Sequence, residues 1–184
     1  MAAAERKAFK QRCTDMKDLL ISTLGFPQFT VEDFHDTFVE AVEKLDPVSP
    51  AATTSVDGLL ATFNDQGLSD YLIVFLRLIT SGQLQKNADH FANFVDGGRG
   101  VKDFCNQEVE PMNKESDHIH IIALTLALDV SISVEYMDRG AGDQCVQHVF
   151  PEGTSSPKIF LLYRPGHYDI LYRAEGGERP AKTE

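Results

Sequence analysis

The chain is poor in the residues that mark disulfide-bonded, metal-binding and membrane proteins. It has no tryptophan, and its three cysteines, Cys13, Cys105 and Cys145, are odd in number and far apart. Because none of them forms a Cys-x-x-Cys pair, the spacing favours reduced thiols and supports no zinc site. No run approaches the roughly 18 apolar residues of a membrane span, and the first residues lack the apolar core of a signal peptide. We therefore expect a cytoplasmic protein, with the nucleus as an alternative.

Basic residues are also in the minority. The sequence has 17 Lys and Arg against 28 Asp and Glu, which gives a formal net charge of -11 and a pI of about 4.9. An acidic surface repels phosphate, so we expect neither nucleic acid nor an anionic membrane as a partner. The net charge is compatible with a partner that has a basic face. The length of 184 residues, with 42% apolar and 24% charged residues, is typical of one soluble domain with a core of its own.

The first 130 residues show helical periodicity. Phe9, Cys13, Met16 and Leu20 recur at spacings of three and four, which predicts a helix over residues 5–24. Similar patterns predict helices at 31–45, 56–63, 71–79, around 91–95, at 101–109 and at 118–128. For the second helix, Thr30 resembles the start of a capping box, and for the fourth, Ser69 is the expected cap.

After residue 130 the pattern becomes alternating, which is typical of half-buried strands. Strands are predicted at 130–136, 146–150, 158–163 and 168–173, with a glycine-rich turn at 138–143 and a disordered tail from 174. Helices followed by a small, mostly antiparallel sheet form an α+β pattern, which is also the layout of papain-like cysteine proteases.

The chemically most informative residues are His167 and Asp169, which follow a predicted Arg-Pro-Gly turn. Side chains two apart in a strand share a face, and their Cα atoms lie roughly 6–7 Å apart. The aspartate can therefore accept a hydrogen bond from one imidazole nitrogen and leave the other as a base, which is the base-and-orienter part of a catalytic triad. From the residues alone, a structural histidine beside a solvated carboxylate is the more common explanation, because His-x-Asp is a short motif.

Longer blocks of sequence favour the catalytic interpretation. They are Phe-Asn-Asp-Gln at 63–66, Phe-Leu-Arg-Leu at 75–78, Glu-Val-Glu-Pro-Met at 108–112, Lys-Glu-Ser-Asp-His-Ile-His-Ile-Ile-Ala-Leu at 114–124, Val-Glu-Tyr-Met-Asp-Arg-Gly at 134–140, His-Val-Phe-Pro-Glu-Gly at 148–153 and Leu-Leu-Tyr-Arg-Pro-Gly-His-Tyr-Asp-Ile-Leu-Tyr at 161–172. In this order they closely resemble the otubains, deubiquitinating cysteine proteases of the ovarian-tumour class. The resemblance runs from about residue 9 to residue 173, and we expect the domain to span 5–173.

The resemblance implies a papain-like fold and thiol-dependent hydrolysis of ubiquitin isopeptide bonds in polyubiquitin, typically of the proteasome-directing linkage, without cofactor or metal. It places His167 on the general base and Asp169 on its orienter. The family's nucleophile lies in an Asp-Gly-Asn-Cys-Phe-Tyr segment before the first helix, and this chain starts after it. We therefore expect a domain that is incomplete at its N-terminus and inactive by itself.

No other cysteine is expected to substitute for the nucleophile. Cys13 and Cys105 lie among apolar residues, where burial raises a thiol pKa, and Cys145 opens a strand and so lacks a helix N-terminus to stabilise a thiolate.

The same resemblance places residues 115–120 on the ubiquitin-binding side and suggests Glu115, Asp117 and His118 as contacts, although a helix cap at Ser116 or Asp117 explains this stretch equally well. His118 and His120 should face different directions, and His35 should lie on the surface. Three hypotheses stay open. The chain is a shortened deubiquitinase without catalysis, a binding protein for ubiquitin or a ubiquitin-conjugating enzyme, or an incomplete domain that folds poorly.

Overall fold

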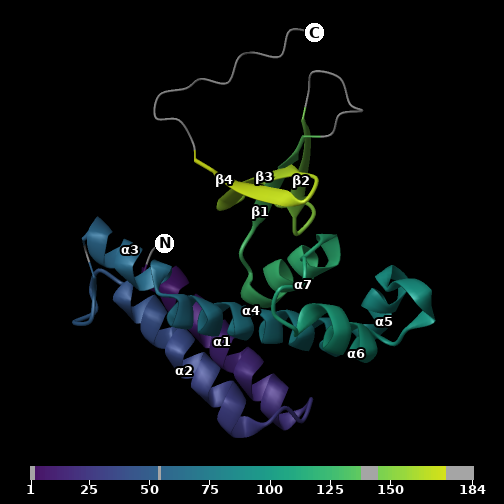
Figure 1. The fold of residues 1–184 in the computed structure, drawn as a ribbon, viewed down its shortest axis with the longest axis horizontal. Coiled ribbons are helices and arrows are strands. Elements are labelled where there is room, and N and C mark those ends of the chain that lie inside the picture. Colours follow the sequence, from purple (N-terminus) through teal and green to yellow (C-terminus); the bar gives the residue numbers. More distant parts are fainter. Residues whose placement is uncertain (1–2, 54, 138–144, 173–184) are drawn as a thin grey trace, which may run out of the picture. The chain divides into compact units, whose positions relative to one another are not determined.

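The fold is described by a computed structural model, which covers residues 3–53, 55–137 and 145–172 (Figure 1). The chain divides into a helical unit, Met1–Asp129, and a sheet unit, Val130–Glu184. The turn predicted at 138–143 and the tail predicted from 174 lie outside the described residues. No helix within the described residues is long and apolar enough to cross a membrane.

The helical unit contains the helices that the periodicity predicts. They are α1 Ala3–Ser22, α2 Gln28–Lys44, α3 Val56–Asn64, α4 Gln66–Lys86, α5 Ala88–Phe91, α6 Val101–Phe104 and α7 His118–Leu128. The short 3₁₀ turns η1 Ala92–Phe94 and η2 Asp96–Gly98 follow α5, and the π turn η3 Cys105–Val109 continues α6. α4 crosses the unit and packs against α1, α2 and α7 (Figure 1).

Two of the predicted helix starts are wrong. α2 begins at Gln28 after Pro27, so Thr30 lies inside the helix and does not cap it. α4 begins at Gln66 rather than at Ser69, because the Asp65 carboxylate accepts a hydrogen bond of 2.8 Å from the backbone N–H of Leu68. A cap at Asp65 satisfies a backbone donor that would otherwise lack a partner, so the helix extends one turn further back than the apolar pattern indicates.

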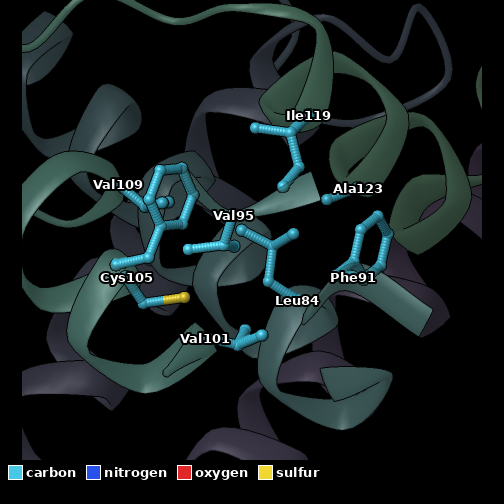
Figure 2. Packing of buried hydrophobic residues seen from close by; sticks show 9 residues of the cluster. Leu84, Phe91, Val95, Val101, Cys105, Val109, Ile119 and Ala123 are labelled. Carbon is cyan, nitrogen blue, oxygen red and sulfur yellow. The ribbon is translucent and has the colours of Figure 1, made fainter. Parts of the chain in front are cut away.

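The main core of the helical unit is a cluster of buried apolar side chains from α4 to α7. Its members are Leu84, Phe91, Val95, Val101, Phe104, Cys105, Val109, Ile119 and Ala123. Figure 2 shows these side chains pointing toward one another from separate helices. Phe91 is only 1% exposed in this cluster. A second cluster, formed by Leu20, Val31 and Leu78, joins α1 and α2 to α4.

The sheet unit contains β1 Ile132–Tyr136, β2 Val146–Phe150, β3 Ile159–Arg164 and β4 His167–Leu171. The strand order is β2-β1-β3-β4, with antiparallel pairs β1–β2 and β3–β4 and a parallel pair β1–β3. The prediction of a mostly antiparallel sheet is therefore confirmed. Pro165 and Gly166 join β3 to β4, and the φ of 78° at Gly166 is a conformation that glycine adopts without a Cβ clash.

Aromatic side chains form a row across one face of this sheet. Tyr136, Tyr163 and Tyr168 lie opposite one another on β1, β3 and β4, with ring centroids 4.8 Å apart, and His148 on β2 continues the row at 4.8 Å. A slip of one residue would turn these rings to the other face, so the row helps to hold the register. That register decides which side chains lie beside His167.

The core predicts a clear difference between two neighbouring phenylalanines. Phe91→Ala should lower the free energy of unfolding by about 3–5 kcal/mol, because it empties a buried site. Phe94→Ala should change it by less than about 0.5 kcal/mol, because Phe94 is 58% exposed. Urea unfolding followed by circular dichroism measures both. Equal losses for the two variants would contradict the packing described here.

Candidate functional site

His167 and Asp169 lie on one face of β4, immediately after the turn that joins it to β3. The Nε2 atom of His167 is 3.0 Å from the Oδ1 atom of Asp169. An ionised carboxylate can only accept, so Nε2 carries the proton and Nδ1 keeps the lone pair. The expected hydrogen bond between these side chains is present, and Nδ1 is the nitrogen that it leaves available as a base.

A third residue, Arg164, shares the same carboxylate. Its Nη2 atom lies 3.1 Å from Oδ2 of Asp169, and Arg164 is paired with His167 across the β3–β4 hairpin. The hydrogen bond from His167, together with the charge of Arg164, outweighs desolvation and lowers the pKa of Asp169 below its ordinary value. The carboxylate therefore stays ionised and remains an acceptor for the imidazole.

The cysteines of the helical unit are buried and protonated at neutral pH. Burial raises the pKa of Cys13 to about 12 and that of Cys105 to about 11. The Cys105 thiol also contacts the carbonyl oxygen of Ser81 at 3.8 Å. A thiol that stays protonated is a poor nucleophile, so the interpretation of both residues as packing residues agrees with their surroundings.

Cys145 is exposed, but it lies at the opposite edge of the sheet from His167. It precedes β2, whereas His167 begins β4, and β1 and β3 lie between these two strands. Three strand spacings separate the two positions by roughly 14 Å, far beyond the reach of a proton transfer. None of the three thiols in this sequence is thus suited to act as the nucleophile.

The helical unit holds a groove at the start of α7. Its volume is about 290 Å³, and its lining residues are His90, Phe91, Phe94, Asp117, His118, Ile119 and Ile122. Two of the three suggested ubiquitin contacts, Asp117 and His118, therefore lie together in one groove. Glu115 is exposed on the loop before α7 and is not part of the lining.

Asp117 has a structural role as well, because it is the N-cap residue of α7. Its Oδ1 atom lies 2.7 Å from Nδ1 of His120, and its backbone N–H lies 3.2 Å from the same nitrogen. Nδ1 cannot donate and accept at once, and the shorter, charge-assisted contact identifies it as the donor to the carboxylate. Asp117 is thus the N-cap residue of α7 and also lines the groove, and its expected contact with ubiquitin stays a prediction.

The other histidines differ in their burial. His118 is exposed and His120 is buried, so the expectation that they face different directions is confirmed. His35 is 7% exposed, and the prediction that it lies on the surface is wrong. Its ring packs against Phe75 at 5.6 Å, and its Nδ1 atom lies 2.8 Å from Asp36. Apolar packing against α4 explains a burial that the charged neighbours in the sequence do not indicate.

Comparison with known proteins decides the family. The sequence profile of peptidase family C65, the otubains, matches residues 1–173. The chain belongs to the otubain family. Ubiquitin thioesterase OTUB1 of Homo sapiens is 59% identical over 169 residues, which are 92% of this chain and 60% of the relative. Ubiquitin thioesterase OTUB2 of Homo sapiens is 41% identical over 167 residues, which are 91% of this chain and 68% of the relative. The chain thus spans about 60% of the length of its OTUB1 relatives.

Solved otubain structures share the fold. A complex described as h/ceOTUB1, ubiquitin aldehyde and UBC13~Ub matches with a TM-score of 0.85 and 37% identity, over 95% of this chain and 67% of the other. A ceOTUB1 complex with ubiquitin aldehyde and UBC13~Ub matches with a TM-score of 0.86 at the same identity, over 95% and 69%. The papain-like α+β architecture expected from the sequence is therefore the fold of this otubain.

A second pocket and the acidic, histidine and cysteine side chains elsewhere offer no competing chemistry within the described residues. A pocket of about 560 Å³ in the helical unit is lined mostly by apolar residues of α1, α2, α3 and α4, with the Arg6–Asp46 ion pair beside it. It contains no nucleophile and no base. Within residues 3–53, 55–137 and 145–172, no group of three or more His, Cys, Asp or Glu side chains could hold a metal ion.

Sequence reasoning missed two parts of the site. It treated Arg164 only as a turn residue, although its position directly before a two-residue turn places it across from His167. It also missed His90 and Phe94 as neighbours of Asp117, since no local pattern joins α5 and η1 to the start of α7.

The Asp169 carboxylate should titrate below its ordinary value of 3.8. A depressed pKa contributes stability that is present above the unfolded value and lost as the pH falls through the folded value. The contact with His167 should therefore persist as the pH drops to that midpoint. Carbon-13 NMR of the Asp169 carboxyl group measures it, and a midpoint at or above 3.8 would contradict the hydrogen bond.

Proposed function

We propose that this otubain binds ubiquitin and carries the base and orienter of thiol-dependent isopeptide hydrolysis, and that the 184-residue chain by itself does not hydrolyse. The observation that carries the proposal is the 3.0 Å contact between His167 Nε2 and Asp169 Oδ1 in a chain of the otubain family. In this chemistry the base accepts a thiol proton, the thiolate attacks the carbonyl carbon, and the base returns the proton to the departing lysine amine. Nδ1 of His167 is the nitrogen in position for both transfers.

The absence of hydrolysis follows from the three thiols. Cys13 and Cys105 are buried and protonated, and Cys145 lies three strands from His167. A base can generate a thiolate only from a thiol that is accessible and close to it, and none of the three cysteines meets both conditions. The same residues would support catalysis only together with a nucleophile that approaches Nδ1.

The groove at the start of α7 supports ubiquitin binding. Phe94 is exposed and lines the groove together with Ile122, and Asp117 adds negative charge to this apolar surface. Exposed aromatic residues are frequent anchors of protein interfaces, and acidic neighbours favour a partner with basic groups. Ubiquitin is the partner that the relatives indicate, because they are ubiquitin thioesterases and are solved with ubiquitin aldehyde.

The binding prediction compares two exposed phenylalanines. Phe94→Ala should weaken ubiquitin binding about fivefold or more, because it removes the apolar anchor of the groove. Phe29→Ala is the control, since Phe29 is exposed on α2, outside the groove. Titration of each variant with monoubiquitin, followed by NMR, measures the dissociation constants. Equal affinities for both variants and the parent chain would place the binding surface elsewhere.

Catalysis is tested separately with diubiquitins of each lysine linkage and with a thiol-reactive ubiquitin probe. We expect binding without cleavage or labelling, and the strongest binding for the proteasome-directing linkage of polyubiquitin. Cleavage or labelling would show that one of the three thiols is a nucleophile. Failure to bind any form of ubiquitin would contradict the proposed role of the groove.

A second candidate function is binding of a ubiquitin-charged conjugating enzyme. It is favoured by the similarity to otubain complexes with UBC13~Ub and UBCH5B~Ub, at TM-scores of 0.84 to 0.86. The chain should then slow ubiquitin transfer from a charged conjugating enzyme to free lysine, in proportion to its concentration. An unchanged transfer rate at saturating chain would reject this role and leave the ubiquitin-binding role intact.

A further inference from the structure

The carboxylate of Asp169 is held on both of its oxygens. His167 Nε2 lies 3.0 Å from Oδ1, and Arg164 Nη2 lies 3.1 Å from Oδ2. Arg164 and His167 are directly paired across the β3–β4 hairpin, and Asp169 follows two residues later on the same face. The three side chains therefore form a closed arrangement in which the aspartate is the shared member.

Solvent exposure makes the second contact important. The side chains of His167 and Asp169 are 57% and 43% exposed, so close packing does not hold either one. The terminal torsion of an aspartate is broad, and a carboxylate fixed at a single oxygen tilts and exchanges its partners with water. A planar guanidinium on the second oxygen restricts that motion, because its donors point in fixed directions.

The backbone places Arg164 for this contact. It is the last residue of β3, and the two-residue connection Pro165–Gly166 sets it opposite the first residue of β4. Residues on paired strands are held more precisely than residues on loops. The ion pair of Arg164 with Asp169 spans 3.1 Å on this face. The neighbouring carboxylate of Glu135 accepts a hydrogen bond of 2.7 Å from Gln147.

We propose that Arg164 is a positioning residue of this site. By fixing Asp169 it keeps the His167 ring in one orientation, with Nε2 toward the carboxylate and Nδ1 toward the position of an attacking thiol. This inference rests on the proposed function, in which His167 is the base. The depressed pKa of Asp169, to which Arg164 contributes, is consistent with the contact.

The test uses NMR of the full chain, because it needs no catalysis. The readouts are the solvent exchange rate of the His167 Nε2 proton and the nitrogen-15 shifts of the ring. Arg164→Gln should speed the exchange about two- to fivefold, the range expected for losing one exposed ion pair, and shift the ring nitrogens toward a mixture of tautomers. Arg164→Lys should give an exchange rate between those of the parent chain and Arg164→Gln, since lysine keeps the charge but lacks the planar guanidinium.

Two further variants separate the possible outcomes. Asp169→Ala should disturb the ring at least as much as Arg164→Gln, and Lys102→Gln, which removes one exposed positive charge from α6, should leave it unchanged. A ring that responds to Asp169→Ala but not to Arg164→Gln would overturn the positioning role and leave the proposed base and orienter in place. A ring that responds to neither would reject the His167–Asp169 pair itself.

The controls also cover charge and folding. An equal response to Lys102→Gln would show a general effect of charge and overturn the role of Arg164. If Arg164→Gln does not fold, the Arg164→Lys variant decides the question. Faster exchange of the His167 Nε2 proton than in the parent chain then supports the positioning role. An exchange rate and ring shifts equal to those of the parent chain reject that role.

Discussion

The site depends on one hydrogen bond between side chains two residues apart at the start of an edge strand. The contact of His167 Nε2 with Asp169 selects which imidazole nitrogen carries the proton and which is free to act as a base. Its geometry follows from the strand period, but its persistence at an exposed position needs support. The sheet provides that support through the hairpin register, which places Arg164 on the second oxygen of the carboxylate.

Register is in turn maintained by the other face of the same sheet. The row formed by His148, Tyr136, Tyr163 and Tyr168 contains no group that takes part in the proposed chemistry. A slip of β4 by one residue would break the row and would also move His167 and Asp169 to the opposite face. Packing on one face therefore secures the chemistry on the other.

The helical unit divides its roles in a similar way. Phe91 is buried in the core while Phe94, three residues later, is exposed in the groove, so one short segment both anchors the unit and presents a binding surface. Asp117 combines two roles at a single side chain, since it is the N-cap residue of α7 and lines the groove. Its substitution would therefore affect both the helix and the binding surface, and a change at Phe94 separates the two effects.

The sequence by itself determined the features that depend on neighbours a few residues apart. The helical and strand periods, the α+β order and the shared face of His167 and Asp169 follow from local backbone geometry, and the long blocks of family sequence identified the otubain fold. Only the tertiary structure decided the contacts between distant segments, namely His90 and Phe94 beside Asp117 and the burial of His35 against Phe75. It also showed the contact of Arg164 with Asp169, five residues away in the same hairpin, which depends on the strand register. A periodic pattern states which face of an element is apolar, but the partner of that face is set by packing and register, which no local pattern encodes.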